Sequence, residues 1–351
     1  MVEAAHEPKF NFWIFDTKYT TLVVDFKAVE RISAPFQVDL SLASEDEIEF
    51  DKVVGKQALL TILGAEEDRY IHGIVNKFMQ NGSKGRFYLY EARIVPSLWL
   101  LSLEQDCRIF QNEKVEDIVK KVLQERGITS DRFDFKLQNK YPEREYCVQY
   151  RETDLNFISR LLEEEGIFYC FEHFEDKHLL IFGDSPVAYQ PIKGTAEVTF
   201  NASVGMVPEE ECLFRYTYSR RILSGKFTQQ DFNFEKPAVD LTTQEQADSY
   251  QKLEVYDYPG RYLDQGRGKK LTQVRLQEYL TFKELGEGQS SCVRMIPGFT
   301  FKLTDNDRDV FNKEYLLVEV LTTGAQPQAV QEETYSGLGL RYSNEFQCIS
   351  R

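Results

Sequence analysis

Alternation of apolar and polar side chains governs residues 10–95, where short apolar runs are separated by polar turns. A period of two residues is typical of a strand with one buried face. Turn signals divide the runs, among them Gly64 and the pair of Asn81 and Gly82. The pattern predicts a compact barrel or sandwich of six short strands, at residues 10–15, 21–30, 36–44, 55–64, 70–79 and 85–95.

A helical period begins after Pro96, which closes the strand-rich region. Apolar residues then recur at spacings of three and four and form one stripe, made of Val115, Ile118, Val119, Val122 and Leu123. Asn112 is expected to cap the start of this amphipathic helix. Gly127 is expected to take the left-handed conformation just after its end.

A second helix is predicted in the segment that ends with three consecutive glutamates. Its apolar stripe consists of Leu155, Ile158, Leu161 and Leu162. Thr153 or Asp154 is the expected N-cap, and Gly166 is the expected stop.

The period changes to two after this helix, which predicts a hairpin of residues 167–173 and 178–184. The turn between the two strands falls at residues 174–177. His173 is therefore expected at a strand end and not over the glutamates that close the helix.

Strand patterns return after residue 195 and are interrupted by one predicted helix at residues 271–285. The expected strands cover residues 196–202, 212–222, 225–234, 299–303 and 315–323. The whole chain thus reads as a strand-rich region, a helix and hairpin region, and a second strand-rich region that contains an insertion.

Composition narrows the classes of function. The formal net charge of -15 argues against a nucleic-acid partner, because phosphate binding needs a basic surface. The opening segment lacks the pattern of a signal peptide, and no apolar run approaches the length of a membrane span, so stable membrane insertion is not expected. We expect a cytoplasmic origin, with export by a route that needs no signal peptide left open. An aromatic content of 13% suits strands and large packed interfaces.

The cysteines are spread along the chain without a CxxC pair or a zinc spacing, so free thiols are expected. They are Cys107, Cys147, Cys170, Cys212, Cys292 and Cys348.

Catalytic and metal-binding motifs are absent from the sequence, and we predict no enzyme activity, cofactor or metal. None of His6, His72, His173 and His178 belongs to a GxSxG-type triad or an HExxH motif. Exposed imidazoles are therefore favoured over a metal site at His173 and His178. A glycine- and lysine-rich stretch that begins at Gly266 lacks the Walker A spacing and is expected to be a loop entering a helix.

An acidic stretch near the carboxyl end imitates the first half of a calcium-binding loop through Asp305, Asp307 and Asp309. Val310 stands where that loop needs glycine, and Leu316 stands where it needs a bidentate glutamate. A hairpin turn is the predicted role of this segment.

The glutamate run is the sharpest question in the sequence, because carboxylates at a helix C-terminus are mildly unfavourable. Glu163, Glu164 and Glu165 cannot all face one site, since adjacent helical residues point about 100 degrees apart. Arg160 allows weak intrahelical pairs with Glu163 and Glu164. The alternatives are a solvated face with such pairs, an interface that attracts cations of another domain or subunit, and, least favoured, an acid-base site.

Six stretches together resemble one family, in the order in which that family has them. They cover residues 95–128, 150–173, 225–237, 256–262, 297–320 and 342–349. They look like the amino-terminal hub of VgrG, the tip protein of the type VI secretion system. This hub is similar to the baseplate hub of contractile-tailed phages and to the late control protein D of P2-like phages.

The resemblance implies an α+β, mainly β fold, with two similar small β-barrels flanked by helix-containing domains. Three chains would form a ring with pseudo-sixfold symmetry. The expected domains are a first barrel at 1–105, a helix and hairpin domain at 106–190, a second barrel at 191–236 and 295–351, and an inserted helix-containing segment at 237–294.

The resemblance also implies a structural function. The trimeric hub would join a sixfold tube of Hcp-type subunits to a threefold spike, contact baseplate proteins and, in a longer chain, carry spike-tip and effector proteins. VgrG chains continue into a spike where this sequence stops, so a fragment is preferred over a naturally short hub of a phage tail or a phage-tail-like injection particle.

A motif at residues 256–262 adds candidate contact residues. Pro259 and Gly260 predict a tight turn around which Tyr256, Tyr258 and Tyr262 pack. A structural corner is favoured there over a subunit contact. Together with Arg160, Glu163, Glu164 and Glu165, the candidate interface residues are Tyr256, Tyr258, Arg261 and Tyr262. A carbohydrate-binding module and a cell-wall hydrolase are the alternatives from other classes.

Overall fold

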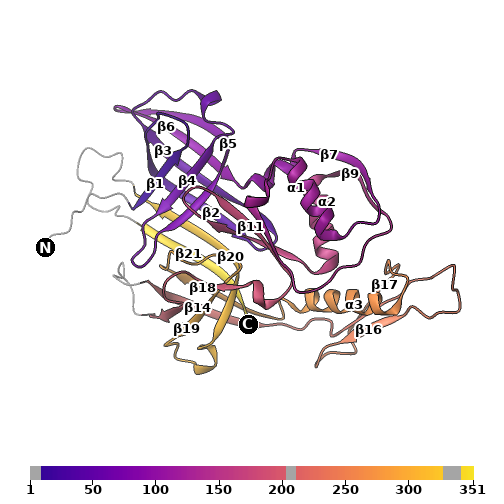
Figure 1. Ribbon diagram of the computed structural model, residues 1–351. Coiled ribbons are helices and arrows are strands. Elements are labelled where there is room, and N and C mark those ends of the chain that lie inside the picture. The colour runs from indigo at the N-terminus through magenta and orange to yellow at the C-terminus, as the bar shows by residue number, and fades with distance from the viewer. Residues whose placement is uncertain (1–8, 203–210, 327–340) are drawn as a thin grey trace.

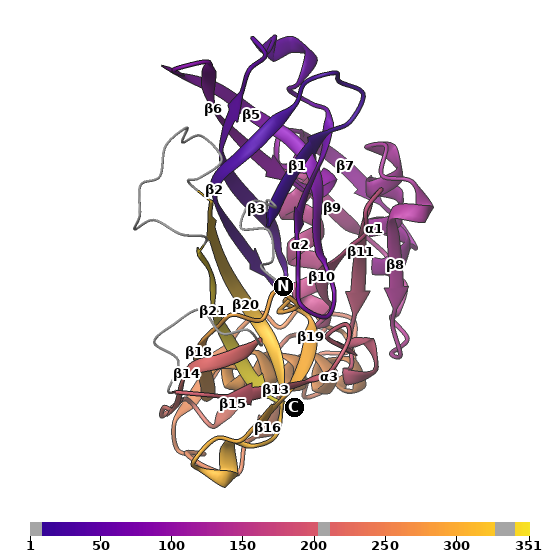
Figure 2. The same cartoon turned by 90° about the vertical axis from the view of Figure 1, so that its left-hand side faces the viewer.

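A closed ring of β-strands forms the first part of the molecule (Figures 1 and 2). The computed structural model describes residues 9–202, 211–326 and 341–351. The strands of this first barrel are β1 Phe10–Ile14, β2 Thr21–Arg31, β3 Ala34–Ser44, β4 Gln57–Ile62, β5 Arg69–Lys84 and β6 Phe87–Val95. Their order is β1-β4-β5-β6-β3-β2, and β1 pairs with β2 to close the ring. All six strands predicted at residues 10–95 are confirmed.

The two-residue alternation fills this barrel with apolar side chains. Phe26 and Ala28 of β2 are buried, whereas Lys27 between them is exposed. Phe10 and Phe26 meet edge to face, with ring centroids 5.1 Å apart. Each fully buried side chain of this kind stabilises the fold by about 1.5–3 kcal/mol relative to its exposed state.

A second closed ring follows in the chain and lies beside the first (Figure 1). Its strands are β13 Glu197–Phe200, β14 Cys212–Arg220, β18 Glu284–Ser290, β19 Phe299–Thr304, β20 Glu314–Ala325 and β21 Arg341–Ser350. Their order is β19-β13-β14-β18-β21-β20, and β20 pairs with β19 to close the ring. This barrel has a separate core, in which Phe301 packs against Tyr315 and Phe346.

The two barrels share one connectivity. In each of them the first strand lies between the second and the fourth, and the sixth lies between the third and the fifth. The first strands differ in direction, because β13 runs parallel to its neighbours and β1 runs antiparallel. The last halves of β2 and β20 pair antiparallel, from Asp25 opposite Ala325 to Arg31 opposite Glu319, and fuse both barrels into one sheet.

The helix and hairpin unit packs against the first barrel (Figure 2). It consists of β7 Gln105–Phe110, α1 Val115–Glu125, β8 Phe133–Lys136, β9 Cys147–Thr153, α2 Asp154–Glu165, β10 Phe168–His173 and β11 His178–Gly183. Both predicted helices and the hairpin are confirmed, and so are Thr153 as N-cap of α2 and Gly127 and Gly166 as left-handed stops. The expected cap of α1 is wrong, because the N-cap position is Lys114, with no side-chain hydrogen bond.

An arm projects from the second barrel between β14 and β18 (Figure 1). It contains β15 Lys226–Gln229, β16 Thr243–Gln246, β17 Glu254–Asp257 and α3 Gln265–Leu280. The predicted helix exists but begins and ends earlier than expected, because Leu285 belongs to β18. The glycine- and lysine-rich stretch lies inside the first turns of α3 and not in a loop before it.

The remaining elements are short. They are β12 Gln190–Pro191, which pairs with β19, and 3-10 turns at Phe50–Lys52, Ser97–Ser102, Ser130–Arg132, Pro186–Ala188 and Asp309–Phe311. The last of these lies in the turn between β19 and β20, as predicted for the acidic stretch. Among the described helices, none has the length and apolar character needed to cross a membrane.

The division of the chain into domains stays a prediction, although strand pairing bears on two of its boundaries. Among the described residues β15 pairs only with strands of the arm, although residues up to 236 were expected in the second barrel. β18 pairs with β14 and β21 of that barrel, although residues up to 294 were expected in the insertion. These pairings favour an arm that begins near residue 221 and ends near residue 283.

A buried ion pair sits where these parts meet. Arg69 of β5 donates to the carboxylate of Glu30 of β2. It also donates to the carbonyl oxygens of Val293 and Met295, which lie between β18 and β19 of the second barrel. Both side chains are buried. Burial alone would raise the pKa of Glu30, but the charge of Arg69 and the contact with His173 outweigh it and lower the pKa.

Removing one partner of this pair should destabilise the protein strongly. In Arg69→Leu, Glu30 is left as an uncompensated buried charge, so we expect a loss of about 3–5 kcal/mol in the free energy of unfolding, measured by urea denaturation. The double variant Glu30→Leu with Arg69→Leu should recover much of that loss. A single variant as stable as the parent protein would contradict this account.

Candidate interface and junction sites

The three glutamates form the last turn of α2. The residues that cap the two ends of this helix fix the position of that turn. The hydroxyl of Thr153 accepts a hydrogen bond from the backbone N–H of Asn156 at 3.2 Å. Gly166 ends the helix with φ of 71°, a conformation that a residue with a side chain rarely adopts. The three carboxylates therefore project from the last turn toward the arm.

Each glutamate meets an arginine of the same chain. The ion pairs are Glu163–Arg275 at 3.2 Å, Glu164–Arg144 at 2.8 Å, Glu164–Arg261 at 3.4 Å, Glu165–Arg144 at 2.7 Å and Glu165–Arg267 at 2.5 Å. Three of these arginines belong to the arm, and Arg144 belongs to the helix and hairpin unit. The run is thus a joint between two parts of one chain.

The glutamates of this joint differ in how far their side chains are exposed. The side chain of Glu165 is 2% exposed, and the arginines that it meets are 20% exposed. Glu163 is 59% exposed, so its pair with Arg275 is screened by water and worth little. Glu165 is therefore the anchor of the joint, because a buried carboxylate must keep its cationic partners.

Arg160 does not form the intrahelical pairs that its spacing allowed. Its guanidinium donates to the carboxylate of Glu152 at 2.6 Å and to the carbonyl oxygen of Val148 at 2.7 Å. Arg160 therefore ties α2 to β9 and takes no part in the joint.

Only one of the three tyrosines at residues 256–262 packs around the turn. Tyr262 is buried, and its hydroxyl donates to the carbonyl oxygens of Gln229 and Leu241. Its ring lies so close to Gly260 and Gly268 that neither position has room for a Cβ atom. The turn is thus a structural corner, whereas Tyr256 and Tyr258 are exposed and were wrongly expected to pack around it.

The outer end of the arm displays further apolar side chains. Phe232, Phe234 and Leu263 are exposed, as are the neighbouring Tyr256 and Tyr258. The carboxylate of Asp231 accepts from the backbone N–H of Tyr262, and the side-chain oxygen of Asn233 accepts from two backbone N–H groups of its own loop. This arm tip therefore presents aromatic surface on a hydrogen-bonded loop, as protein contact sites commonly do.

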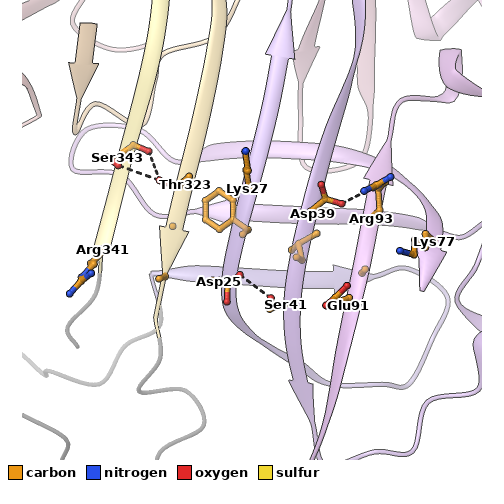
Figure 3. A pocket seen from close by; sticks show the side chains of 15 residues that line it. Asp25, Lys27, Asp39, Ser41, Lys77, Glu91, Arg93, Thr323, Arg341 and Ser343 are labelled. Carbon is orange, nitrogen blue, oxygen red and sulfur yellow. Dashed lines mark hydrogen bonds and ion pairs between the residues drawn. The ribbon is translucent and has the colours of Figure 1, made fainter. Parts of the chain in front are cut away.

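A groove of about 580 Å³, lined mainly by charged and hydroxyl-bearing residues, crosses the exposed face of the joined sheet (Figure 3). Asp39 pairs with Arg93 at 2.6 Å, and Asp25 accepts from Ser41 at 2.9 Å. A smaller groove of about 300 Å³ continues along the same sheet over β14, β18, β20 and β21. Among the described residues, no exposed large apolar side chain belongs to β2, β3, β6, β18, β20 or β21. This face is polar, in contrast to the arm tip.

Three histidines form a buried cluster at the junction between the first barrel and the β10–β11 hairpin, so the expectation of exposed imidazoles is wrong. His72 comes from β5, and His173 and His178 face each other across the hairpin. The backbone N–H of Ser97 donates to Nε2 of His178, and Nδ1 of His178 lies 3.1 Å from Nδ1 of His72. The backbone N–H of His72 donates to Nδ1 of His173. The burial arises because Phe36 packs against the rings of His173 and His178.

These bonds suit neutral imidazoles. Because Nε2 of His178 accepts from Ser97, its Nδ1 carries the proton and donates to Nδ1 of His72. Burial lowers the pKa of His72 to about 4 and holds the pKa of His178 well below its usual value. Within the described part of the chain, no group of three or more metal-binding side chains is placed to hold an ion.

Sequence reasoning missed the partners of the charged residues. Arg267 is 102 positions away from Glu165, and Arg69 is 39 positions away from Glu30, so no spacing rule connects them. Cys107, Cys147, Cys170, Cys292 and Cys348 are free thiols, as expected, and all of these but Cys107 are buried.

The chain is thus a mainly β protein built of two barrels with one connectivity, fused into one sheet. The family described as the phage tail baseplate hub (GPD) matches residues 29–328, and the chain belongs to that family.

Similar proteins with curated descriptions are spike proteins of type VI secretion systems. VgrG4b of Pseudomonas aeruginosa is 34% identical over 341 residues, which cover 96% of this chain and 42% of that protein. VgrG3 of Vibrio cholerae is 35% identical over 319 residues, which cover 90% of this chain and 31% of that protein. The chain thus spans less than half the length of these relatives.

Solved structures share the fold. A type VI secretion component, the E. coli protein c3393, superposes with a TM-score of 0.73 at 24% identity, covering 97% of this chain and 77% of that one. A tail protein of Neisseria meningitidis gives a TM-score of 0.68 at 12% identity, covering 97% of this chain and 95% of that one. The resemblance to VgrG and phage hubs is confirmed, as is the mainly β, hub-like fold. The family is described as a tail baseplate hub, and the two VgrG relatives are described as spike proteins.

Neutralising the anchor of the joint should loosen the arm. In Glu165→Gln two charge-assisted contacts weaken in a buried place, so we expect α3 to exchange its amide protons at least tenfold faster, by hydrogen exchange with mass spectrometry. The matched control Glu163→Gln removes an exposed pair and should leave exchange in α3 nearly unchanged. Equal effects of both variants would contradict the assignment of Glu165 as the anchor.

The histidine cluster should make the free energy of unfolding depend on pH at pH values above those at which carboxyl groups usually titrate. Unfolded histidine binds its proton below about pH 6.5, but folded His72 binds it only below about pH 4. The stabilisation is therefore fully present above pH 6.5 and is lost as pH falls toward 4. We expect the unfolding constant from urea denaturation to rise up to about tenfold per pH unit for each such histidine.

Two variants separate titration from packing. In His72→Asn the amide oxygen can still accept the hydrogen bond from His178, so the local structure should be kept. Because asparagine does not titrate, the number of protons taken up on unfolding between pH 5 and 6.5 should fall by about one. In Phe36→Leu the packing against His173 and His178 is reduced but His72 remains, so stability should fall even above pH 6.5 and the contribution of His72 to the pH dependence should persist. An unchanged slope in the His72 variant would overturn this assignment.

Proposed function

We propose that the chain is the hub of a VgrG-type tip, an adaptor that joins a sixfold tube of Hcp-type subunits to a threefold spike. The observation that supports this most directly is the pair of barrels with one connectivity, fused through β2 and β20. Three such chains would offer six similar barrels, which suits a partner with six equivalent subunits.

The proposed partners follow from the same arrangement. They are two further copies of this chain, an Hcp-type hexameric tube, baseplate proteins and, in a longer chain, spike-tip and effector proteins. The hub would assemble in the bacterial cytoplasm and leave the cell without a signal peptide. A hub of a contractile phage tail or of a phage-tail-like injection particle is the second candidate, favoured by the family described as a phage baseplate hub.

The candidate contact residues divide into two groups under this proposal. Tyr256, Tyr258 and Arg261 lie on the exposed part of the arm and are proposed to face another subunit. The glutamate run and Tyr262 would act indirectly, because they hold the arm in place from inside the chain.

An assembly assay tests the adaptor. Light scattering of the chain should show a concentration-dependent trimer, and a mixture with hexameric Hcp-type protein should elute together at a ratio of three chains to six. Tyr256→Ser with Tyr258→Ser should weaken assembly without unfolding the chain, whereas Val310→Ser, at an exposed position in the turn between β19 and β20, serves as control. Absence of both self-association and tube binding at high concentration would reject the proposal.

A further inference from the structure

The turn end of the β10–β11 hairpin is held on the first barrel by hydrogen bonds that end on histidine nitrogens. His173 and His178 face each other at the last position of the hairpin ladder before the turn. Nδ1 of His173 accepts from the backbone N–H of His72 at 3.2 Å. Nε2 of His178 accepts from the backbone N–H of Ser97 at 3.2 Å. Both bonds therefore exist only while these two ring nitrogens carry no proton.

A third bond joins two of the rings themselves. Nδ1 of His178 donates to Nδ1 of His72 at 3.1 Å, which requires that the accepting nitrogen carries no proton. A further proton on His72 would set two N–H groups against each other. A further proton on His178 must go to Nε2, to which Ser97 already donates. Each added proton would therefore turn a bond across the junction into a contact between two donors.

The buried carboxylate beside the cluster already has partners. Glu30 of β2 accepts from Arg69 of β5 through one oxygen. Its other oxygen lies 3.6 Å from Nε2 of His173. The negative charge of Glu30 is therefore directed at Arg69 and His173, and a proton added to another ring of the cluster gains little from it.

The other groups around the cluster also disfavour a further proton. Burial lowers the pKa of His72 and His178 most, and the charges of His173 and Arg132 lower the pKa of both further. Asp176 of the hairpin turn raises the pKa of His72, but it is exposed and its effect is the smallest of these. The turn at residues 97–102 brings no acidic or basic side chain to the cluster. An added charge would thus stay uncompensated as long as the junction is closed.

The root of the same hairpin is held without histidines. The backbone N–H of Ser33 donates to the carbonyl oxygen of Tyr169 at 2.7 Å, and β11 pairs with β8 inside its own unit. At the turn end, the hydroxyl of Tyr70 donates to the carboxylate of Glu175 at 2.9 Å, but this bond is exposed to water. The histidines therefore hold the end of the hairpin that can part from the barrel, while the root stays attached.

Packing of aromatic rings favours the closed junction as long as the histidines are neutral. Phe36 of β3 and Phe171 of β10 meet edge to face, with ring centroids 5.1 Å apart. The rings of His173 and His178 pack against the same Phe36. A buried imidazolium loses more hydration than a buried imidazole. Opening would uncover Phe36 and Phe171 and would return the protonated rings to water.

We propose that His72, His173 and His178 form an acid-sensitive latch, which releases the turn end of the β10–β11 hairpin from the first barrel while both barrels stay folded. The inference goes beyond the proposed function and does not rest on it, because the latch lies within one chain. It also differs from a general loss of stability in acid, since it assigns the proton uptake to one local opening.

Proton linkage sets the size of the effect. In the open form His72 binds its proton below about pH 6.5, whereas in the closed form its pKa is about 4. The closed form is therefore fully favoured above pH 6.5, and the opening constant rises as pH falls toward 4. Between pH 7 and pH 5 we expect a rise of about twentyfold from His72. His178 adds a further rise, because its pKa in the closed form is also held well below the usual value.

The bonds of the latch can be read from the ring nitrogens. In a chain labelled with nitrogen-15 histidine, NMR at neutral pH should show the proton of His178 on Nδ1 and the proton of His72 on Nε2. The first assignment follows from the bond that Ser97 donates to Nε2 of His178. A His178 that carries its proton on Nε2 in the folded chain would overturn the latch.

Hydrogen exchange tests the opening itself. The backbone N–H groups of His72 and Ser97 are bonded to the latch. Their protection, corrected for the effect of pH on the intrinsic rate, should fall by about twentyfold or more between pH 7 and pH 5. About 1 M urea should leave this exchange nearly unchanged but speed exchange in the ladder of β20 and β21, which needs global unfolding. Constant protection, or the same urea dependence in both places, would overturn the latch.

A variant that cannot titrate separates the latch from other effects of acid. In His178→Gln the side-chain oxygen can accept from Ser97 but binds no proton, so the fall in protection of Ser97 between pH 7 and pH 5 should shrink by about tenfold or more. The matched control Glu175→Gln lies at the same hairpin end and keeps an acceptor for Tyr70, so it should retain the full fall. If His178→Gln does not fold, His72→Asn carries the same test at Ser97. An equal fall in the parent chain and in the folded histidine variant would overturn the latch.

Discussion

The pairing of β2 with β20 is the constraint on which the rest of the structure depends. It connects strands that lie almost 300 residues apart and holds two separately packed cores in one sheet. Because the pairing uses only the last halves of both strands, their first halves remain free to close the barrels. The relative orientation of the barrels follows from this shared ladder, and so does the continuous polar face across both of them.

Buried charge holds the other parts to this body. Glu30 and Arg69 pair where the first barrel meets the second barrel's 293–295 segment and His173. At the far end of α2, Glu165 receives arginines from the arm and from its own unit. In both places an apolar contact would tolerate sliding, whereas a buried carboxylate needs its cations at defined positions. The arrangement therefore favours a fixed placement of these parts relative to one another.

The local elements were largely predictable, while contacts between them were not. The six strands of the first barrel and the caps of α2 follow from patterns within about a dozen residues, because alternation and capping are local physics. Strand β15 of the arm was predicted, but β16, β17, β7 and β9 were missed, since they are short and pack in narrow two- and three-stranded sheets. The histidines were misjudged because their burial comes from Phe36 and from a neighbouring unit, which no periodicity reveals.

The sequence by itself determined that the chain is mainly β and where α1 and α2 lie, because these features depend on local periodicity. It also determined to which family the chain belongs, because that follows from the order of its motifs. Tertiary structure alone decided what the glutamates meet and that both barrels share a sheet. Those outcomes depend on contacts between residues separated by about 40 to 300 positions. Periodicity and capping patterns act over a few residues, so they cannot predict contacts of that kind.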